Sequence, residues 1–218
     1  STGTTAGNIL FDVALRSTAN EPLTLTSGTG NITFAGTVGA GGGGSVLGKV
    51  TISNANNVTT GAFTATELAQ TVLGAGEFTN TGLITTTTGG ARIQSRIVDL
   101  NAGIAAAGQA VDIDSTSGLL TLNGGDIVTS GGTNQAAGSI NLNTTGGNIV
   151  LARSLAAVGA NRTGVGLGGA AGFDGGAVTL GTTGAGTITL SGTDADITTT
   201  GGNAAGVGNN NGGAGGAV

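Results

Sequence analysis

A pair of apolar–polar–apolar triplets recurs along the chain, and this repeat constrains the fold more than any other feature. In each copy the second triplet begins nine or ten residues after the first. The four pairs are Leu23-Thr24-Leu25 with Ile32-Thr33-Phe34, Val111-Asp112-Ile113 with Leu120-Thr121-Leu122, Ile140-Asn141-Leu142 with Ile149-Val150-Leu151, and Val178-Thr179-Leu180 with Ile188-Thr189-Leu190. Alternation with a period of two, together with the β-branched residues, predicts short strands that each bury one face.

A third short element and a glycine-rich loop follow each of the last three pairs. The third element spans residues 126–129, then 153–155 in a degenerate copy, then 196–199. The loops behind these elements differ in length (residues 131–138, 158–176 and 201–216), whereas the spacing within each pair is kept. Insertions confined to one place in a repeat are typical of a solenoid. We therefore predict an all-β fold, a right-handed parallel β-helix with about three short strands per rung and variable Gly-rich loops at one corner.

The composition fits this prediction better than it fits a β-sandwich. Glycine accounts for 47 of 218 residues, and we expect it to supply positive φ at each tight corner. The only proline, Pro22, precedes a predicted strand, where it removes no hydrogen bond between strands. Five Phe are the only aromatic residues, which suits a narrow core of Ile, Val and Leu, whereas a sandwich usually has aromatic residues in its core.

The stretch from residue 58 to 108 is less regular. Phe63, Leu68, Val72, Phe78 and Leu83-Ile84 are expected to mark further rungs. Residues 66–73 are open to a helical turn capped by Thr66, but the surrounding Thr and Gly favour a strand or a corner. Alternation returns over residues 92–100.

Charge and hydropathy exclude several classes of partner. The net charge is −5 and the sequence pI about 4.3, which disfavours nucleic acid and anionic lipid surfaces. No run of ~18 apolar residues is present, so we expect no membrane span in this segment. No leader or initiator Met is recognisable, and Val218 aligns with Val178 at the start of a unit. Residues 1–218 are therefore expected to form a single β-helix segment of a longer repeat protein, or copies are expected to stack end to end.

Several phrases carry a family resemblance: residues 76–84 (GEFTNTGLI), 198–203 (TTTGGN) and 212–218 (GGAGGAV). They resemble the β-strand repeats of very large bacterial surface proteins, namely filamentous-haemagglutinin-like adhesins and autotransporter passengers. The resemblance covers nearly the whole chain and is rhythmic, without a diagnostic motif. It implies an extracellular or cell-surface fibre used in adhesion or contact with other cells. Self-association end to end or laterally, and a cell-surface glycan or another cell as partner, are the expectations that follow.

The enzymatic and metal-binding alternatives depend on a few acidic residues. Asp112 with Asp114, and Asp194 with Asp196, are each two residues apart, so each pair would share one face of a strand and could offer oxygens to calcium. Calcium needs six to eight oxygens, so solvated acidic positions are the favoured interpretation. Residues 172–176 (GFDGG) are similar to calcium-binding nonapeptide repeats but do not recur at that spacing.

Candidates for acid–base catalysis are few. His and Tyr are absent, and Lys49, Glu21, Glu67 and Glu77 are scattered along the sequence. We therefore predict no enzyme activity and no catalytic, cofactor-binding or metal-binding residues. A polysaccharide-binding or polysaccharide-degrading β-helix stays open as an alternative.

Three further alternatives concern threonine, glycine and asparagine. Residues 84–88 (ITTTT), 187–189 (TIT) and 198–200 (TTT) could supply a Thr array that orders ice, although irregular unit lengths argue against one. Residues 165–176 and 202–216 are expected to be surface loops, with packed extended helices like polyglycine II as the alternative. Four Asn-x-Ser/Thr sequons (Asn31, Asn57, Asn143 and Asn161) are expected by chance in a chain so rich in Asn and Thr.

Overall fold

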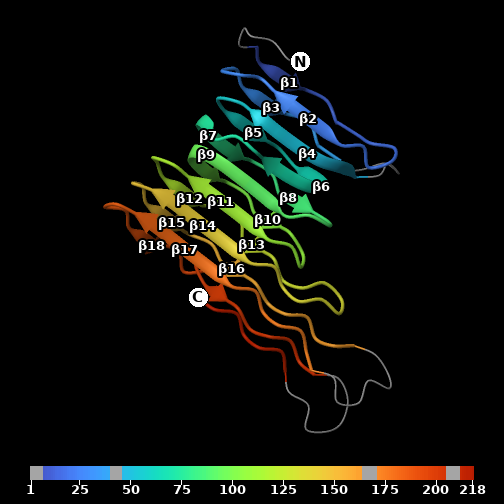
Figure 1. Ribbon diagram of the computed structural model, residues 1–218, viewed down its shortest axis with the longest axis vertical. Coiled ribbons are helices and arrows are strands. Elements are labelled where there is room, and N and C mark those ends of the chain that lie inside the picture. The colour runs from blue at the N-terminus through green and yellow to red at the C-terminus, as the bar shows by residue number, and fades with distance from the viewer. Residues whose placement is uncertain (1–6, 40–45, 164–170, 205–211) are drawn as a thin grey trace.

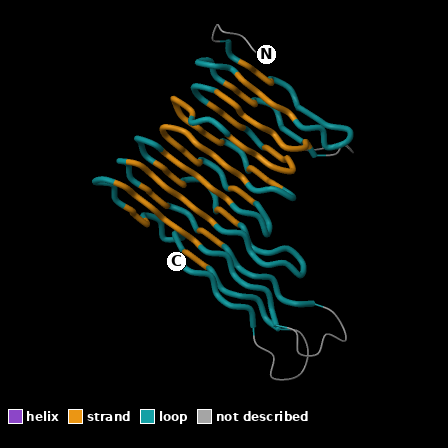
Figure 2. Tube along the Cα trace, viewed as in Figure 1, coloured by secondary structure: helices purple, strands orange, loops and turns teal. Residues whose placement is uncertain are grey.

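The computed structural model describes residues 7–39, 46–163, 171–204 and 212–218. These residues form an all-β structure of 19 strands in one hydrogen-bonded sheet, with no helix among them (Figures 1 and 2). The strands are β1 (Ile9–Phe11), β2 (Leu23–Thr26), β3 (Ile32–Phe34), β4 (Leu47–Asn54), β5 (Val58–Thr60), β6 (Phe63–Gln70), β7 (Gly74–Asn80), β8 (Ile84–Thr86), β9 (Ala91–Leu100), β10 (Ile104–Ala105), β11 (Val111–Ser115), β12 (Leu120–Leu122), β13 (Ile127–Val128), β14 (Ile140–Thr145), β15 (Ile149–Leu151), β16 (Leu155–Ala156), β17 (Val178–Thr183), β18 (Ile188–Leu190) and β19 (Ile197–Thr198).

The strands stack in three ladders, which we call A, B and C. Ladder A contains β2, β4, β6, β9, β11, β14 and β17, and ladder B contains β1, β3, β5, β7, β9, β12, β15 and β18. Ladder C contains β6, β8, β10, β13, β16 and β19. Every one of these pairings is parallel. The long strands β6 and β9 each take part in two ladders, and Figure 1 shows the stack running from blue at one end to red at the other.

All eight predicted triplets are strands, in the order in which the repeat places them. Each first triplet lies in ladder A and each second triplet in ladder B. The third elements are also confirmed, because β13, β16 and β19 lie in ladder C. The parallel order follows from the spacing, since each strand pairs with one that begins 16 or more residues further along the chain.

The less regular stretch also forms strands. Residues 66–70 belong to β6, so the preference for a strand over a helical turn is confirmed. Phe63 and Leu68 lie in β6 and Phe78 lies in β7, so these residues mark further rungs as expected, and all three are fully buried. Ile84 begins β8, as expected, whereas Val72 lies in no strand. Val72 and Leu83 are 47% and 50% exposed, because each lies in the turn before a strand, outside the alternation.

The core is a column of inward side chains that continue from one strand to the next. In ladder A, for example, Ile93, Ile113 and Leu142 are stacked in register and fully buried. Aromatic residues pack together in the part of the core near the N-terminus, where the ring of Phe34 stacks on Phe11 at 5.0 Å between centroids and meets Phe63 edge-on at 5.7 Å. Burial of this column removes apolar surface from water along most of the stack, whereas Ile188 and Leu190 of β18, in the last coil, are 42% and 48% exposed.

A line of buried polar side chains marks the corner between ladders A and B. Each of these polar residues comes two positions after a buried apolar residue of ladder A, as Ser115 comes after Ile113. Ser95, Ser115 and Thr144 are in register there. The Ser115 hydroxyl donates to the Arg96 carbonyl oxygen at 2.8 Å, and the Thr144 hydroxyl donates to that of Gly147 at 2.7 Å. These bonds give the backbone carbonyl oxygens at the corner a hydrogen-bond partner.

Positive φ explains fewer of the glycines than expected. Among the described residues, five glycines have positive φ, at positions 28, 39, 108, 146 and 184. Most others lie where a neighbouring backbone comes too close for a side chain. A Cβ on Gly147, for example, would collide with the Gly118 carbonyl oxygen one level below. The prediction of positive φ at each corner is therefore wrong, because close contact between successive levels is the commoner reason for glycine.

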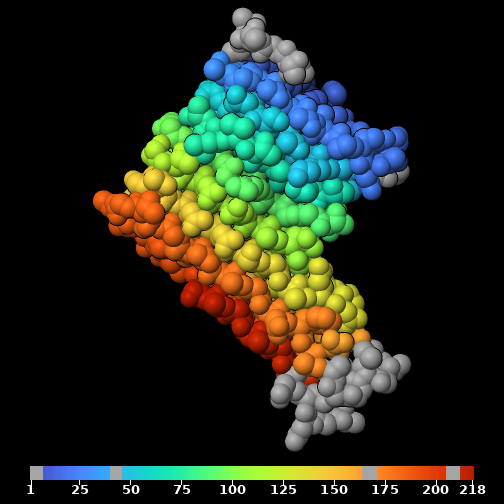
Figure 3. Space-filling model, in the orientation of Figure 1, coloured from blue at the N-terminus to red at the C-terminus, as the bar shows by residue number. Residues whose placement is uncertain are grey.

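The glycine-rich segments after ladder C form a second packed structure, which we call the glycine arm. Its described residues are 129–139, 157–163, 171–177, 199–204 and 212–218, and they run side by side beyond the strands (Figures 2 and 3). Backbone amides connect successive levels: Gly131 donates to Val158 at 2.8 Å, and Gly159 donates to Thr200 at 2.9 Å. Others connect the outgoing and returning segments of one level, as when Gly213 donates to Gly202 at 2.7 Å. The packed alternative therefore describes these residues better than separate surface loops; residues 164–170 and 205–211 lie outside the description.

Candidate functional site

Charged and amide side chains stand together on the outward face of ladder A. Outward positions of β9, β11 and β14 align in two rows, because side chains two residues apart point to the same face of a strand. The first row contains Arg92, Asp112 and Asn141, and the second contains Gln94, Asp114 and Asn143. Six planar polar groups thus stand in a regular array that crosses three levels of the stack.

The two rows differ in how their hydrogen-bonding groups are used. In the second row the Gln94 amide donates to Asp114 at 3.2 Å and the Asn143 amide donates to its other oxygen at 3.3 Å. In the first row Arg92 Nε lies 3.8 Å from Asp112 Oδ2. Partial burial raises the pKa of Asp112, the Asp114 carboxylate raises it further, and the Arg92 guanidinium opposes both effects.

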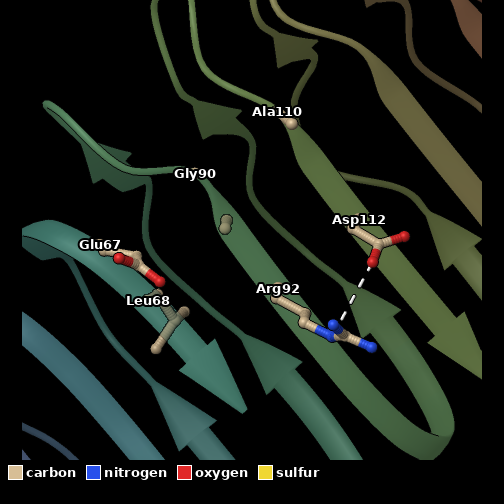
Figure 4. A pocket seen from close by; sticks show the side chains of 7 residues that line it. Glu67, Leu68, Gly90, Arg92, Ala110 and Asp112 are labelled. Carbon is tan, nitrogen blue, oxygen red and sulfur yellow. Dashed lines mark ion pairs between the residues drawn. The ribbon is translucent and has the colours of Figure 1, made fainter. Parts of the chain in front are cut away.

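A hollow of about 180 Å³ lies beside the first row. Glu67, Arg92 and Asp112 form its charged walls, while Gly90, Ala91, Ala110 and Leu68 complete the lining (Figure 4). Glu67, Gly90 and Ala110 occupy the same position on three successive levels, because Leu68, Ala91 and Val111, the residues that follow them, are in register. The hollow exists because the long Glu67 side chain is followed by two residues with little or no side chain. A Cβ on Gly90 would collide with the Ala110 carbonyl oxygen.

A cation on the level below balances Glu67. Lys49 Nζ lies 2.8 Å from Glu67 Oε1, since β4 pairs Lys49 directly with Glu67 of β6. The description of Lys49 and Glu67 as scattered therefore holds for the sequence and not for the structure. Glu21 lies apart, in the loop before β2, where it accepts hydrogen bonds from Ser17, Thr18 and Ala19, and Glu77 lies on β7.

The two predicted acidic pairs have different environments. Asp112 and Asp114 share one face of β11, as expected, but their oxygens face separate partners. Asp194 and Asp196 precede β19 and do not lie on a strand, so the prediction of a shared strand face is wrong for them. Arg153 Nη1 lies 3.4 Å from Asp194, and the Asp196 amide donates to Ser154 Oγ at 3.3 Å.

Within the described ranges no group of three or more His, Cys, Asp or Glu side chains is arranged to hold a metal ion. Of the stretch predicted to be similar to calcium-binding repeats, Asp174 accepts a hydrogen bond from the Ala214 amide at 2.7 Å. This carboxylate therefore ties two levels of the glycine arm together. Beside it Phe173 contacts the Arg162 guanidinium at 4.6 Å, whereas three of the other phenylalanines are buried in the core.

The threonines considered for an ice-binding array fall on different ladders. Thr85 lies beside Thr64 in ladder C, Thr86 is buried, and Thr189 lies beside Val150 in ladder B. The longest outward threonine row in register is Thr33, Thr59 and Thr79, and Asp99 follows it.

Each of the four sequon asparagines makes a hydrogen bond to another level. Asn31 and Asn57 accept from backbone amides of the next level, Asn143 donates to Asp114, and Asn161 accepts from the Asn203 amide at 2.7 Å. These amides therefore contribute to the attachment of successive levels.

Sequence reasoning missed Arg92 and the Lys49–Glu67 pair as parts of a site. The signal for Arg92 was its place in the alternation of residues 92–100. The signal for the buried corner was a Ser or Thr two residues after the second apolar residue of the triplet, as at Ser27, Ser115 and Thr144.

No protein-family model matches the chain, and no significant similarity was found to a curated protein or to a solved structure. In the part of the chain that is described, no helix is long and apolar enough to cross a membrane. Function is therefore inferred from the geometry of the described residues.

Proposed function

We propose that the chain is a right-handed parallel β-helix with three short strands per coil, and that it is a structural or adhesive segment of an extracellular fibre or cell-surface filament. The observation that carries this proposal is the parallel register that continues through all three ladders, with local shifts between β2 and β4 and between β7 and β9. Such a register gives the molecule one axis along which coils are added at a constant rise. With eight strands about 4.8 Å apart, ladder B accounts for about 34 Å of this length.

Side-chain bonds between coils support a mechanical role. Asp114 connects three levels through Gln94 and Asn143. Asp99 accepts from Asn101 of its own level and from Thr121 and Asn123 of the next level. Carboxylates used in this way hold coils together and are not poised to exchange protons with a substrate, which is the basis for proposing a non-catalytic protein.

The proposed location and partners depend on the resemblance to bacterial surface fibres. Only 8% of the residues are charged, and many outward positions carry Thr, Asn or Gly. Small side chains and low charge allow neighbouring fibres to approach closely, so self-association end to end or laterally is part of the proposal.

Electron microscopy and fibre diffraction of the native assembly test this proposal together. We expect elongated particles with a meridional reflection at about 4.8 Å, because the strands of a β-helix run across its axis. Isolated globular particles would overturn the proposal. A 4.8 Å reflection on the equator, which would mean that the strands are spaced across the long axis, would overturn it as well.

A further inference from the structure

Beyond the structural role, we propose that the hollow lined by Glu67, Arg92 and Asp112 binds one pyranose unit of a neutral polysaccharide. The binding would need only a single folded molecule, so it does not depend on assembly into a fibre.

The first reason is that hydrogen-bonding groups at the hollow are uncommitted. The 3.8 Å between Arg92 Nε and Asp112 Oδ2 is longer than a hydrogen bond. Among the described residues, no hydrogen bond to another side chain or to the backbone engages the Arg92 guanidinium or the Asp112 carboxylate. Asp114, two residues away, already accepts two hydrogen bonds. Arg92 therefore offers donors and Asp112 offers acceptors on one side of the same hollow, and a sugar hydroxyl can both donate and accept.

The second reason is the contrast between the floor and the walls. Gly90, Ala91 and Ala110 provide a floor of backbone and small apolar groups, and the charged side chains stand around it. A pyranose ring has the matching form, with C–H groups on its faces and hydroxyls around its edge. The volume of about 180 Å³ suits one ring and not a long segment.

The third reason is the balance of charge, which selects a neutral ligand. Lys49 offsets Glu67 at 2.8 Å, and Arg92 offsets Asp112. The walls thus carry polar groups of both signs without a clear excess of either. An anionic polysaccharide would also be repelled by the chain, because the chain has a net charge of −5.

Above the hollow the same face continues with side-chain amides. Asn141 follows Asp112 in register one level up, and Asn143 follows Asp114. The rise between levels, about 4.8 Å, is close to the length of one sugar unit, so neighbouring units of the chain would meet these amides in turn.

Affinity electrophoresis tests the proposal. The folded protein is run in native gels that contain xyloglucan, galactomannan, starch or dextran as neutral probes and alginate as an anionic probe. The mobility of each variant is compared with its own mobility in a gel without polysaccharide. We expect at least one neutral polysaccharide to retard the wild-type chain. We expect the double variant Arg92→Ala/Asp112→Ala, which keeps the net charge, to bind about tenfold more weakly or worse.

The matched control is Arg153→Ala/Asp194→Ala, which removes an exposed ion pair of the same composition at a distance from the hollow. It should bind as the wild-type chain does. A second test variant, Ala110→Leu, fills the hollow without removing a charge and should also abolish retardation, which keeps the test decisive if the double variant fails to fold. Three results would each overturn the proposal: no retardation by any neutral probe, retardation by alginate alone, or equal loss in the two double variants.

Discussion

Gly202 lies in the glycine arm, where it bonds to two other segments, and its replacement by alanine tests how the arm is held together. Its amide donates to the Phe173 carbonyl oxygen at 2.8 Å, and its own carbonyl oxygen accepts from the Gly213 amide at 2.7 Å. A Cβ at this position would lie closer than 3.0 Å to backbone atoms of Ala160 and Asn161. Since the obstacle is backbone, the segments must separate to admit the methyl group.

The expected loss is the loss of these two backbone hydrogen bonds. At about 1 kcal/mol each, Gly202→Ala should lower the free energy of local opening in the arm by ~2 kcal/mol. That corresponds to roughly 30-fold faster hydrogen exchange for arm amides. The ladders should be little affected, because local opening need not involve the rest of a stacked structure.

Hydrogen exchange followed by mass spectrometry measures this effect segment by segment. Peptides that cover residues 157–163, 171–177, 199–204 and 212–218 should exchange faster, and peptides from β11 and β14 should not. Gly132→Ala is the control within the arm, because its added Cβ would meet only the flexible Gln135 side chain at 3.4 Å. Unchanged exchange in the arm of the Gly202 variant would refute the packed description, as would equal acceleration in the ladders.

Four further predictions concern the core, the buried hydroxyls and two carboxylates. Ile113→Ala should lower the free energy of unfolding by ~2–5 kcal/mol in urea denaturation, because Ile113 is fully buried between Ile93 and Leu142. The outward substitution Asn141→Ala should change it by about 0.5 kcal/mol or less. Equal losses in the two variants would contradict the inward–outward alternation. Thr60→Val and Thr86→Val should be neutral or stabilising in the same assay, because each hydroxyl is buried without a hydrogen-bond partner among the described residues. Ser115→Ala should instead cost ~1 kcal/mol, because it removes the 2.8 Å hydrogen bond to Arg96. A large loss of stability at Thr60 or Thr86 would show that those hydroxyls do have hydrogen-bond partners. Glu21→Gln should lower the melting temperature at neutral pH and have little effect near pH 2. Hydrogen bonds from Ser17, Ala19 and Thr18 lower the pKa of Glu21 to about 2 in the folded state. The carboxylate therefore stabilises the fold above the ordinary pKa of 4.5, and this stabilisation is lost as the pH falls toward 2. Asp112→Asn should raise the melting temperature at neutral pH and have no effect well below pH 3.8. Burial raises the pKa of Asp112 in the folded state, so the wild-type chain loses stability as the pH rises from 3.8 through the raised value. A lower melting temperature of the variant at neutral pH would contradict this prediction.

The strands were predictable because their pattern is local. Alternation over three residues, repeated after nine or ten, identifies β2, β3, β11, β12, β14, β15, β17 and β18 without reference to other parts of the chain. Val72 and Leu83 show where this reasoning fails. An apolar residue just outside a strand has no period to follow, and the backbone of the turn decides where it points.

The candidate site was much less predictable. Lys49 and Glu67 are 18 residues apart, and Arg92 and Asp112 are 20 apart, so their contacts depend on the length of every turn in between. Those turn lengths vary from coil to coil, and only the register of the folded ladders brings each pair together.

The glycine arm was open for a different reason. Glycine and alanine show no alternation, so sequences such as residues 171–177 have the same composition whether they are packed or solvated. The decisive feature is the approach of neighbouring segments, as at Gly175, whose amide donates to Ala214 at 2.8 Å.

A disulfide cross-link between two coils tests the stacked parallel register most directly. The chain has no cysteine, so Asn141→Cys/Thr179→Cys introduces a single pair. These outward positions are register partners on β14 and β17, with Cα atoms about 4.8 Å apart, within the range that a disulfide spans. The control Asn143→Cys/Thr179→Cys is displaced by two residues, which separates the Cα atoms by about 7–8 Å, too far for a disulfide. The account predicts that mild oxidation links the first pair nearly completely and leaves the second pair reduced. Equal or preferential linkage of the displaced pair would contradict it.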